Sequence, residues 1–309
     1  MYSSQCQYEQ YADKIREALT FRVAGIKDSL QAQAYYMVTE SAERNQMFPN
    51  VTIGSFEVEG LSVRVGSKVQ GTIFTPLLTS VDELQKWNEY SVREQEWIEQ
   101  SMRESEASPD YISQSSMGNN EADIVPYVAT LGDGGELTPL TRIPTEVTPV
   151  APWWQTSPPP QNAASTVNLD LLSIDEVGTL FRAMSEAREG LFGPISGFEM
   201  FTDAFVETKA MDGLRNGNRL IGKPLLDIHQ MNEDKDNLEY HPTSIFMQPV
   251  FEDKYDPQSR IIGILHAIVQ WDAFVVNLLP EDVFGIRLIL RNDCGQVYTY
   301  EIEGSDVSG

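Results

Sequence analysis

The N-terminal region carries a regular stripe of apolar positions. The segment from Gln5 to Arg44 has no proline and a single glycine, Gly25. Its apolar residues follow in steps of four, four, three, four, four and three, at Ile15, Leu19, Val23, Ile26, Leu30, Ala34 and Met37. This pattern has a period of about 3.67 residues and keeps one stripe on one side of a nearly straight helix. We therefore predict a helix over residues 1–47, which Phe48-Pro49 ends.

Such a helix has two interpretations. At about 1.5 Å per residue it would be about 60 Å long, which is more than a compact domain uses in its interior. We expect half of it to lie along the domain as a core helix. The remainder is either further core packing or a stalk near a membrane. In a stalk, the stripe would pair with a second copy to give a homodimer, through Ile15, Leu19, Val23, Ile26, Leu30 and Met37.

The middle of the chain alternates between apolar segments and polar breaks. The patterns predict helix, strand, helix, loop and strand over residues 56–68, 69–78, 80–103, 104–121 and 124–131. Ser80 is the expected N-cap of the second helix, with Glu83 completing a capping box. Gly132-Asp133-Gly134-Gly135 predicts a hairpin turn. Residues 138–160 hold seven prolines, and this density predicts irregular extended chain.

A further helix and four closing strands are predicted after this segment. Ser173 and Glu176 form a second capping box, which predicts a helix over residues 174–191. The closing strands are expected over residues 245–251, 260–270, 286–291 and 297–303. Between the second and third, residues 273–279 are expected to form a short helix. We expect Asp272 to cap this helix and Trp271 to pack beneath it.

Length and charge narrow the class of protein. A chain of 309 residues is more than one core usually serves, so two subdomains are expected. With 46 acidic and 22 basic residues the net charge is −24, which repels phosphate backbones and anionic headgroups. Nucleic acid and an anionic membrane surface are therefore poor partners. The charge serves solubility or attracts cations.

The signals for cellular location are weak. Cys6 and Cys294 could form one disulfide, which decides nothing about the compartment. Asn50-Val51-Thr52 is a glycosylation sequon and gives slight support for an extracellular face, with Asn50 as the acceptor. No apolar run of about 18 residues suggests a transmembrane helix, and the first residues lack a secretory apolar segment. The sequence by itself reads as a soluble protein.

Few residues suggest catalysis or metal binding. His229 and His241 fall in expected loops and His266 in the middle of a strand, where a half-buried histidine with satisfied hydrogen bonds is the ordinary interpretation. No spacing typical of a metal site, phosphate loop or nucleophile elbow occurs. Residues 232–239 resemble part of a calcium loop but lack its glycine and final glutamate, so we interpret them as a solvated loop. We expect no metal and no cofactor.

One cluster could hold a small ligand. Tyr127, Trp153, Trp154 and Asp170 combine aromatic walls with one carboxylate, which suits a partly apolar molecule with a hydrogen-bond donor or a positive charge. The alternative is that both tryptophans are core residues. Adjacent residues on a strand point to opposite faces and could not both line one pocket.

The order of elements resembles the extracellular CHASE sensor domain, as found in receptor-type nucleotide cyclases of unicellular algae. The likeness lies in the long helix ending at Phe48-Pro49, in residues 168–173, and in the block Pro249–Gly304 with its Trp271-Asp272 pair. It implies an α+β fold with a long N-terminal stalk helix and two PAS-like subdomains with antiparallel sheets. The expected units are a stalk, a distal ligand-binding subdomain, a linker and a proximal subdomain, over residues 1–47, 48–200, 201–239 and 240–309.

The resemblance implies a function as well. Members of the family sense small molecules, adenine derivatives among them, and pass the signal to an output domain. This chain would then be the extracellular region of a membrane receptor and no enzyme itself, with membrane contact only through flanking segments. Two other hypotheses stay open. One is an acidic hydrolase whose carboxylates cannot be paired from sequence, and the other is an interaction module that uses its long helix.

Overall fold

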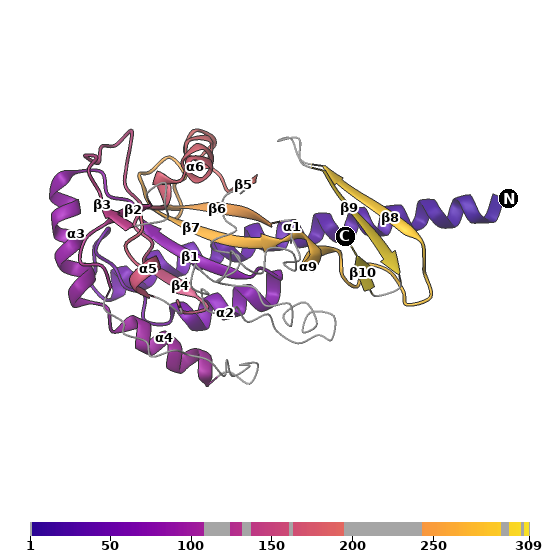
Figure 1. The fold of residues 1–309 in the computed structure, drawn as a ribbon, viewed down its shortest axis with the longest axis horizontal. Helices are drawn as coiled ribbons and strands as arrows, with labels where there is room; N and C mark the ends of the chain where they lie inside the picture. The colour runs from indigo at the N-terminus through magenta and orange to yellow at the C-terminus, as the bar shows by residue number, and fades with distance from the viewer. Residues whose placement is uncertain are drawn as a thin grey trace, which may run out of the picture.

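The protein folds into an α+β structure with a long N-terminal helix and antiparallel sheets, as the sequence predicts. The computed structural model describes residues 2–107, 124–131, 137–160, 163–194, 243–291, 297–303 and 306–308. Figure 1 shows a large sheet with helices around it at one end of the molecule and a small sheet at the other. The two sheets lie along one helix.

That helix is α1 (Tyr2–Glu43), which follows the long axis of the molecule (Figure 1). The predicted apolar stripe is its buried side. Ile26, Leu30 and Met37 have no exposed surface and belong to the core beneath the large sheet. Ile15 is buried nearer the N-terminus, in a second core formed with the small sheet. Leu19 packs against both cores.

The stripe therefore packs inside the chain over most of its length. Of the positions expected to form a homodimer contact, Ile15, Ile26, Leu30 and Met37 are buried, and Leu19 and Val23 are half-buried. The physical reason is that the small sheet covers α1 around Ile15, in the part of the helix that runs beyond the large sheet. The stripe that repeats every 3.67 residues thus contributes to two successive cores within the chain.

The large sheet has five antiparallel strands in the order β4-β1-β7-β6-β5. Their bounds are β1 (Gly71–Pro76), β4 (Gln155–Ser157), β5 (Leu191–Pro194), β6 (Thr243–Phe251) and β7 (Ile261–Gln270). The two longest strands, β6 and β7, pair along most of their length, and the predicted turn at Asp256–Ser259 joins them. Strand β1 is the first of these strands in the sequence and β7 is the last, and the two are neighbours at the centre of the sheet.

This sheet crosses the expected domain boundary. Strands β1, β4 and β5 come from the residues expected to form the distal subdomain, whereas β6 and β7 come from those expected to form the proximal one. A boundary at residues 201–239 therefore falls between strands of a single sheet. The four closing strands are at the predicted places, but only the first two join this sheet.

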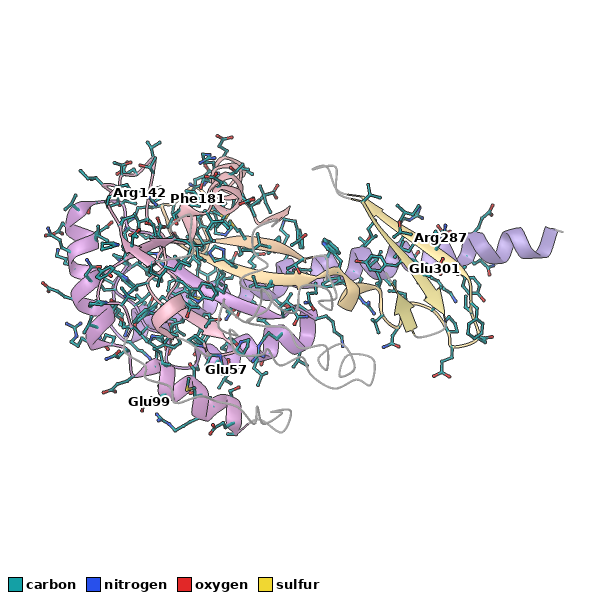
Figure 2. All side chains as sticks on the ribbon, viewed as in Figure 1. Glu57, Glu99, Arg142, Phe181, Arg287 and Glu301 are labelled. Carbon is teal, nitrogen blue, oxygen red and sulfur yellow. The ribbon has the colours of Figure 1, made fainter. Side chains whose placement is uncertain are left out.

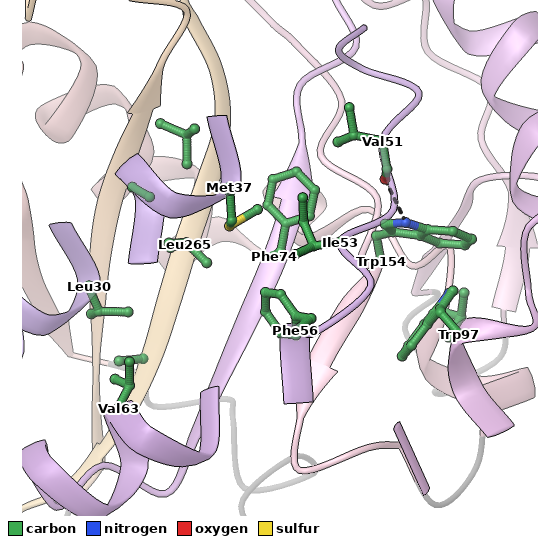
Figure 3. Packing of buried hydrophobic residues seen from close by; sticks show 14 of the residues in the cluster. Leu30, Met37, Val51, Ile53, Phe56, Val63, Phe74, Trp97, Trp154 and Leu265 are labelled. Atoms are coloured by element: carbon green, nitrogen blue, oxygen red, sulfur yellow. Dashed lines mark hydrogen bonds between the residues drawn. The ribbon is translucent and has the colours of Figure 1, made fainter. Parts of the chain in front are cut away.

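One face of the large sheet packs against α1 and three further helices, and we call it the α1 face. The helices are α2 (Phe56–Ser67), α3 (Val81–Arg93) and α4 (Trp97–Glu106). Figure 3 shows the centre of this core, where Met37 and Leu30 of α1 approach Phe74 and Leu265 of the sheet. Burying a side chain of this size stabilises the fold by about 1.5–3 kcal/mol, so this core is the main anchor of α1.

The helix predicted over residues 80–103 is two helices. Ser80 caps α3 as expected, since its Oγ accepts a hydrogen bond from Glu83 N at 3.2 Å. The helix ends at Arg93, and α4 begins at Trp97. In one straight helix, Trp87 and Trp97 would point about 80° apart around the axis. The break lets both rings pack against Trp154.

The opposite face of the sheet, which we call the α6 face, packs against α6 (Asp175–Ala187) and the single turn η1 (Leu171–Ser173). The predicted Ser173 cap is wrong. Its hydroxyl donates to Asp170 O at 2.6 Å, and Asp170 caps η1 instead. A hairpin of β2 (Ala129–Leu131) and β3 (Leu137–Pro139) packs against the core of this face through Leu131 and Leu137, whereas the short helix α5 (Ala163–Thr166) contributes Ala163 to the core of the α1 face.

The small sheet follows directly from β7. That strand runs into α9 (Trp271–Val275), which begins two residues earlier than predicted and contains Asp272 rather than following it. Trp271 Nε1 donates to Ser244 Oγ at 2.8 Å, so Trp271 packs as expected. The antiparallel sheet has the order β10-β9-β8, from β8 (Ile286–Arg291), β9 (Val297–Glu303) and β10 (Asp306–Ser308).

Several sequence predictions lie outside the described residues. They include the linker at 201–239, most of the loop at 104–121, the turn at 132–135, and His229, His241 and Cys294. The side chain of Cys6 is outside them as well. The register Leu131↔Leu137 shows that the chain reverses between β2 and β3, as the turn signal predicts.

The two interpretations of α1 predict different effects of the same substitution. Leu30→Ala removes a fully buried side chain and is expected to lower the free energy of unfolding by about 2–5 kcal/mol in urea titrations. The matched control Phe21→Ala lies on the exposed side of the same helix, 79% exposed, and should change it by about 0.5 kcal/mol or less. A Leu30→Ala protein that keeps its stability but changes its oligomeric state would contradict the assignment.

Candidate functional site

The aromatic residues expected to share a pocket lie on opposite faces of the large sheet. Trp153 belongs to the core of the α6 face and Trp154 to that of the α1 face, and neither has exposed surface. Trp154 Nε1 donates to Val51 O at 3.0 Å, and its ring packs against Trp87 and Trp97 (Figure 3). Trp154 is therefore a core residue, and the alternation argument against a shared pocket holds.

Asp170 is buried and bound within the chain. Its Oδ1 accepts hydrogen bonds from Ala151 N at 2.9 Å and Leu172 N at 3.3 Å, and its Oδ2 pairs with Arg142 Nη2 at 2.5 Å. Burial raises the pKa of the Asp170 carboxyl, and the Arg142 guanidinium partly opposes this. Tyr127 is half-buried just before β2. The carboxylate thus holds η1 and residues 142–151 together instead of facing an open pocket.

His266, which the sequence analysis interpreted as an ordinary strand residue, replaces Asp170 as the candidate ligand-binding residue. His266 lies in the middle of β7, opposite Ile73 of β1 and Met247 of β6. It is fully buried, and burial lowers the pKa of its imidazole to about 3, so the ring is neutral at physiological pH. Its Nε2 is 2.9 Å from Thr75 Oγ1, but its Nδ1 has no hydrogen-bond partner.

A second unpaired polar atom lies in the same row of the sheet. Ile73 pairs with His266 on one side and with Thr156 of β4 on the other, so the three side chains share a face. Ile73 belongs to the core beneath α6, which makes this the α6 face. Thr156 is fully buried and its Oγ1 has no hydrogen-bond partner.

The row Thr156, Ile73, His266 and the neighbouring Thr75 therefore form the candidate site. The ordinary interpretation of His266, a half-buried residue with its hydrogen bonds satisfied, is wrong on both points. The available signal was its position inside the apolar run from Ile264 to Ile268, where an imidazole is expensive to bury. The location of Thr156 could not be read from sequence, because the pairing of β4 with β1 was not predicted.

A separate groove lies at the other end of the molecule. It has a volume of ≈340 Å³ and runs between the N-terminal part of α1 and strand β8. Tyr11, Ile15 and Leu19 line the helix side together with Arg16, and Ile286, Arg287 and Leu288 line the strand side. This volume is at the lower end of the range typical of small-ligand pockets.

Comparison with known proteins leaves the family open. No protein-family model matches the chain, and no curated protein sequence does. Among the described residues, no three His, Cys, Asp or Glu side chains gather where they could hold a metal ion. Within the same residues, no helix combines the length and apolar character needed to cross a membrane.

The neutral His266 predicts a specific dependence of stability on pH. Its folded pKa of about 3 lies below the unfolded value of about 6.5, so its contribution is present above pH 6.5 and is lost as pH falls. Between pH 7.5 and 5 this loss should be about 2 kcal/mol. His266→Gln should lack it, so the unfolding free energy of the unaltered protein should fall by this amount relative to that of the variant over this range. A constant difference would show that His266 already titrates normally.

The structural role of Asp170 predicts that substitution of Arg142 lowers the stability more than substitution of Arg103. Figure 2 labels Arg142 and Glu99, the partner of Arg103. Arg142→Gln leaves a buried carboxylate without its cation and should lower the unfolding free energy by about 1–3 kcal/mol. Arg103→Gln removes an exposed pair with Glu99, whose atoms are 3.6 Å apart, and should cost less than about 1 kcal/mol. Thermal unfolding measures both, and equal effects would contradict the assigned role of Asp170.

Proposed function

We propose that this chain is a small-molecule sensing region whose ligand binds on the α6 face of the large sheet, at His266 and Thr156. The observation that carries the proposal is the unpaired Nδ1 of a fully buried, neutral His266. We further propose that the large sheet is a PAS-like unit. The support is its antiparallel order, with the first and last strands of the unit at its centre and helices on both faces.

The cost of burying an unpaired imidazole nitrogen supports a ligand at His266. A buried polar atom left without a partner costs about 1–3 kcal/mol. A leucine or isoleucine at position 266 would continue the apolar run of β7 without this cost. An imidazole in the centre of the sheet, with Thr156 Oγ1 unpaired in the same row, is explained if a bound molecule supplies the missing hydrogen bonds.

The network indicates what the ligand must offer. We assign the imidazole proton to Nε2, so that Nε2 donates to Thr75 Oγ1 at 2.9 Å and the Thr75 hydroxyl faces Ile264 O at 3.4 Å. His266 Nδ1 is then an acceptor. The ligand should be small and mostly apolar, with an N–H or O–H donor directed at the ring. Planar nitrogen heterocycles such as adenine derivatives have this chemistry, and the CHASE resemblance includes receptors for them.

The arrangement also suggests how binding is transmitted. His266 lies on β7, which runs directly into α9, and residues 276–285 connect α9 to the small sheet. Helix α1 packs against the large sheet through Leu30 and against the small sheet core through Ile15. A ligand that binds two arrangements of these parts unequally would shift their equilibrium by its difference in affinity. The signal would pass along β7 and α1 together.

The wider setting belongs to the same proposal. The chain would be the extracellular region of a membrane receptor, with a nucleotide cyclase or kinase as its output domain and a homodimer as its working state. In this setting Asn50 would carry a glycan. Its side chain is half-buried with Oδ1 covered, and the Thr52 hydroxyl of the sequon lies 2.7 Å from Tyr90 Oη. Mass spectrometry of the secreted chain would test the glycan directly.

The test is a thermal-shift screen of the purified chain with adenine derivatives and other small nitrogen heterocycles. A ligand at 100 times its dissociation constant should add about 2.7 kcal/mol of stability. His266→Leu should abolish the shift of any true ligand without unfolding the protein, because it replaces the unpaired ring by an apolar side chain.

Two threonines provide matched controls. Thr156→Val removes the unpaired hydroxyl on the α6 face and should weaken binding. Thr72→Val removes an equally buried, unpaired hydroxyl from the opposite face and should leave binding unchanged. A ligand whose shift survives His266→Leu would contradict the proposed site, and a broad library without any shift would contradict the sensing function.

A further inference from the structure

Strand β8 lies at the edge of the small sheet. No strand in the described part of the chain pairs with its outer side. The sheet order is β10-β9-β8, so one row of β8 backbone donors and acceptors has no strand partner among those residues. Native proteins usually protect such an edge with proline, lysine or an inward charge. The sequence Ile-Arg-Leu-Ile-Leu-Arg of residues 286–291 has no proline and no lysine, and Ile289 is 49% exposed. Its charged residues are Arg287 and Arg291, and Arg287 is paired with Glu301 of β9.

The groove described above lies along this edge. A strand added beside β8 would run over it, and every second side chain of that strand would point toward α1. Tyr11, Ile15 and Leu19 would then contact these side chains. The free edge offers backbone hydrogen bonds and the groove offers apolar contact, which are the two parts of recognition by strand addition.

The existing neighbour of β8 indicates which side chains an added strand should carry. On β9, Tyr300 and Ile302 are buried opposite Leu288 and Ile286, and they pack in the core with α1. Glu301 lies between them on the other face and pairs with Arg287, whose Nη2 is 2.7 Å from Glu301 Oε1 (Figure 2). Thus β8 already binds a strand whose last four residues, 300–303, alternate apolar and acidic side chains.

We propose that the outer edge of β8 binds an extended peptide of alternating apolar and acidic residues, which adds to the small sheet as a fourth strand. Its apolar side chains fill the groove between β8 and α1. Its acidic side chains lie beside Arg287 on the opposite face, as Glu301 does on the inner side. The partner is a peptide of this pattern and not a second β8, because β8 itself offers arginines at 287 and 291 where the site requires carboxylates.

The probe is a capped peptide with the sequence of residues 297–303, Val-Tyr-Thr-Tyr-Glu-Ile-Glu, titrated into the full chain by calorimetry. It is expected to bind, whereas the same peptide with both glutamates replaced by lysine should bind about three- to tenfold more weakly. Methylation of alternate backbone amides, tried in both registers, should abolish binding in one register and spare it in the other.

A charge exchange within the protein makes the test specific. The double variant Arg287→Glu with Glu301→Arg keeps the internal ion pair but reverses the charge beside the outer edge. It should prefer the lysine peptide to the glutamate peptide, and Arg103→Gln on the distant helix α4 should change neither affinity. Circular dichroism confirms that each variant is folded.

Three outcomes would overturn the proposal. They are no binding of the glutamate peptide, equal affinity for both peptides in the unaltered chain, and a preference that the double variant does not reverse. Self-association of the chain through β8, abolished by Ile289→Lys while the peptide fails to bind, would assign the edge to a second copy instead. The site is independent of His266, since His266→Leu should leave peptide binding unchanged.

Discussion

The pairing of β1 with β7 is the interaction on which the rest of the structure depends. It joins residues 71–76 to residues 263–268, nearly two hundred positions apart in sequence. Among the described strands, β4 attaches only to β1, and the pair of β6 and β5 attaches only to β7, so without this pairing the large sheet would be two separate pieces. The same pairing separates the two faces of the sheet, and each face then has its own core. It also brings Thr75 to His266.

Helix α1 connects the large sheet to the small sheet. Because its apolar stripe stays on one side over its length, it can bury Leu30 under the large sheet and Ile15 under the small one. The link from β7 through α9 is a second connection between the same two parts. A change at the centre of β7 is therefore mechanically joined to the small sheet by two routes, one along the backbone and one through packed side chains.

Much of this fold could be predicted from residues that are close together in the sequence. The rest depends on pairing between distant segments. The periodicity of α1, the Ser80 cap and the bounds of β6 and β7 follow from residues near one another, and all were predicted closely. The assignment of β6 and β7 to one sheet with β1 was not, because the choice of strand partner depends on burial across the whole chain. The same limit hid the β4 pairing and the division of α3 from α4.

The candidate site also combines features that are visible in the sequence with features that depend on distant segments. Asp170 was expected to bind a ligand because the sequence analysis grouped it with Tyr127, Trp153 and Trp154, but Arg142 and the Ala151 amide already pair with it. The location of His266 in an apolar strand was visible, and its unpaired Nδ1 was not, since that depends on what β1 and β6 place beside it. A buried polar residue inside an apolar run is thus a useful signal, although its hydrogen-bond state is a tertiary property.

The most direct measurement of the central claim is the nitrogen-15 NMR spectrum of the histidine side chains, with His266 assigned by its absence from the His266→Gln protein. The account predicts a neutral imidazole protonated at Nε2 that does not titrate between about pH 5 and 8, with an Nδ1 resonance that moves when a ligand binds. A ring that titrates near pH 6.5, or one with the proton on Nδ1, would contradict it.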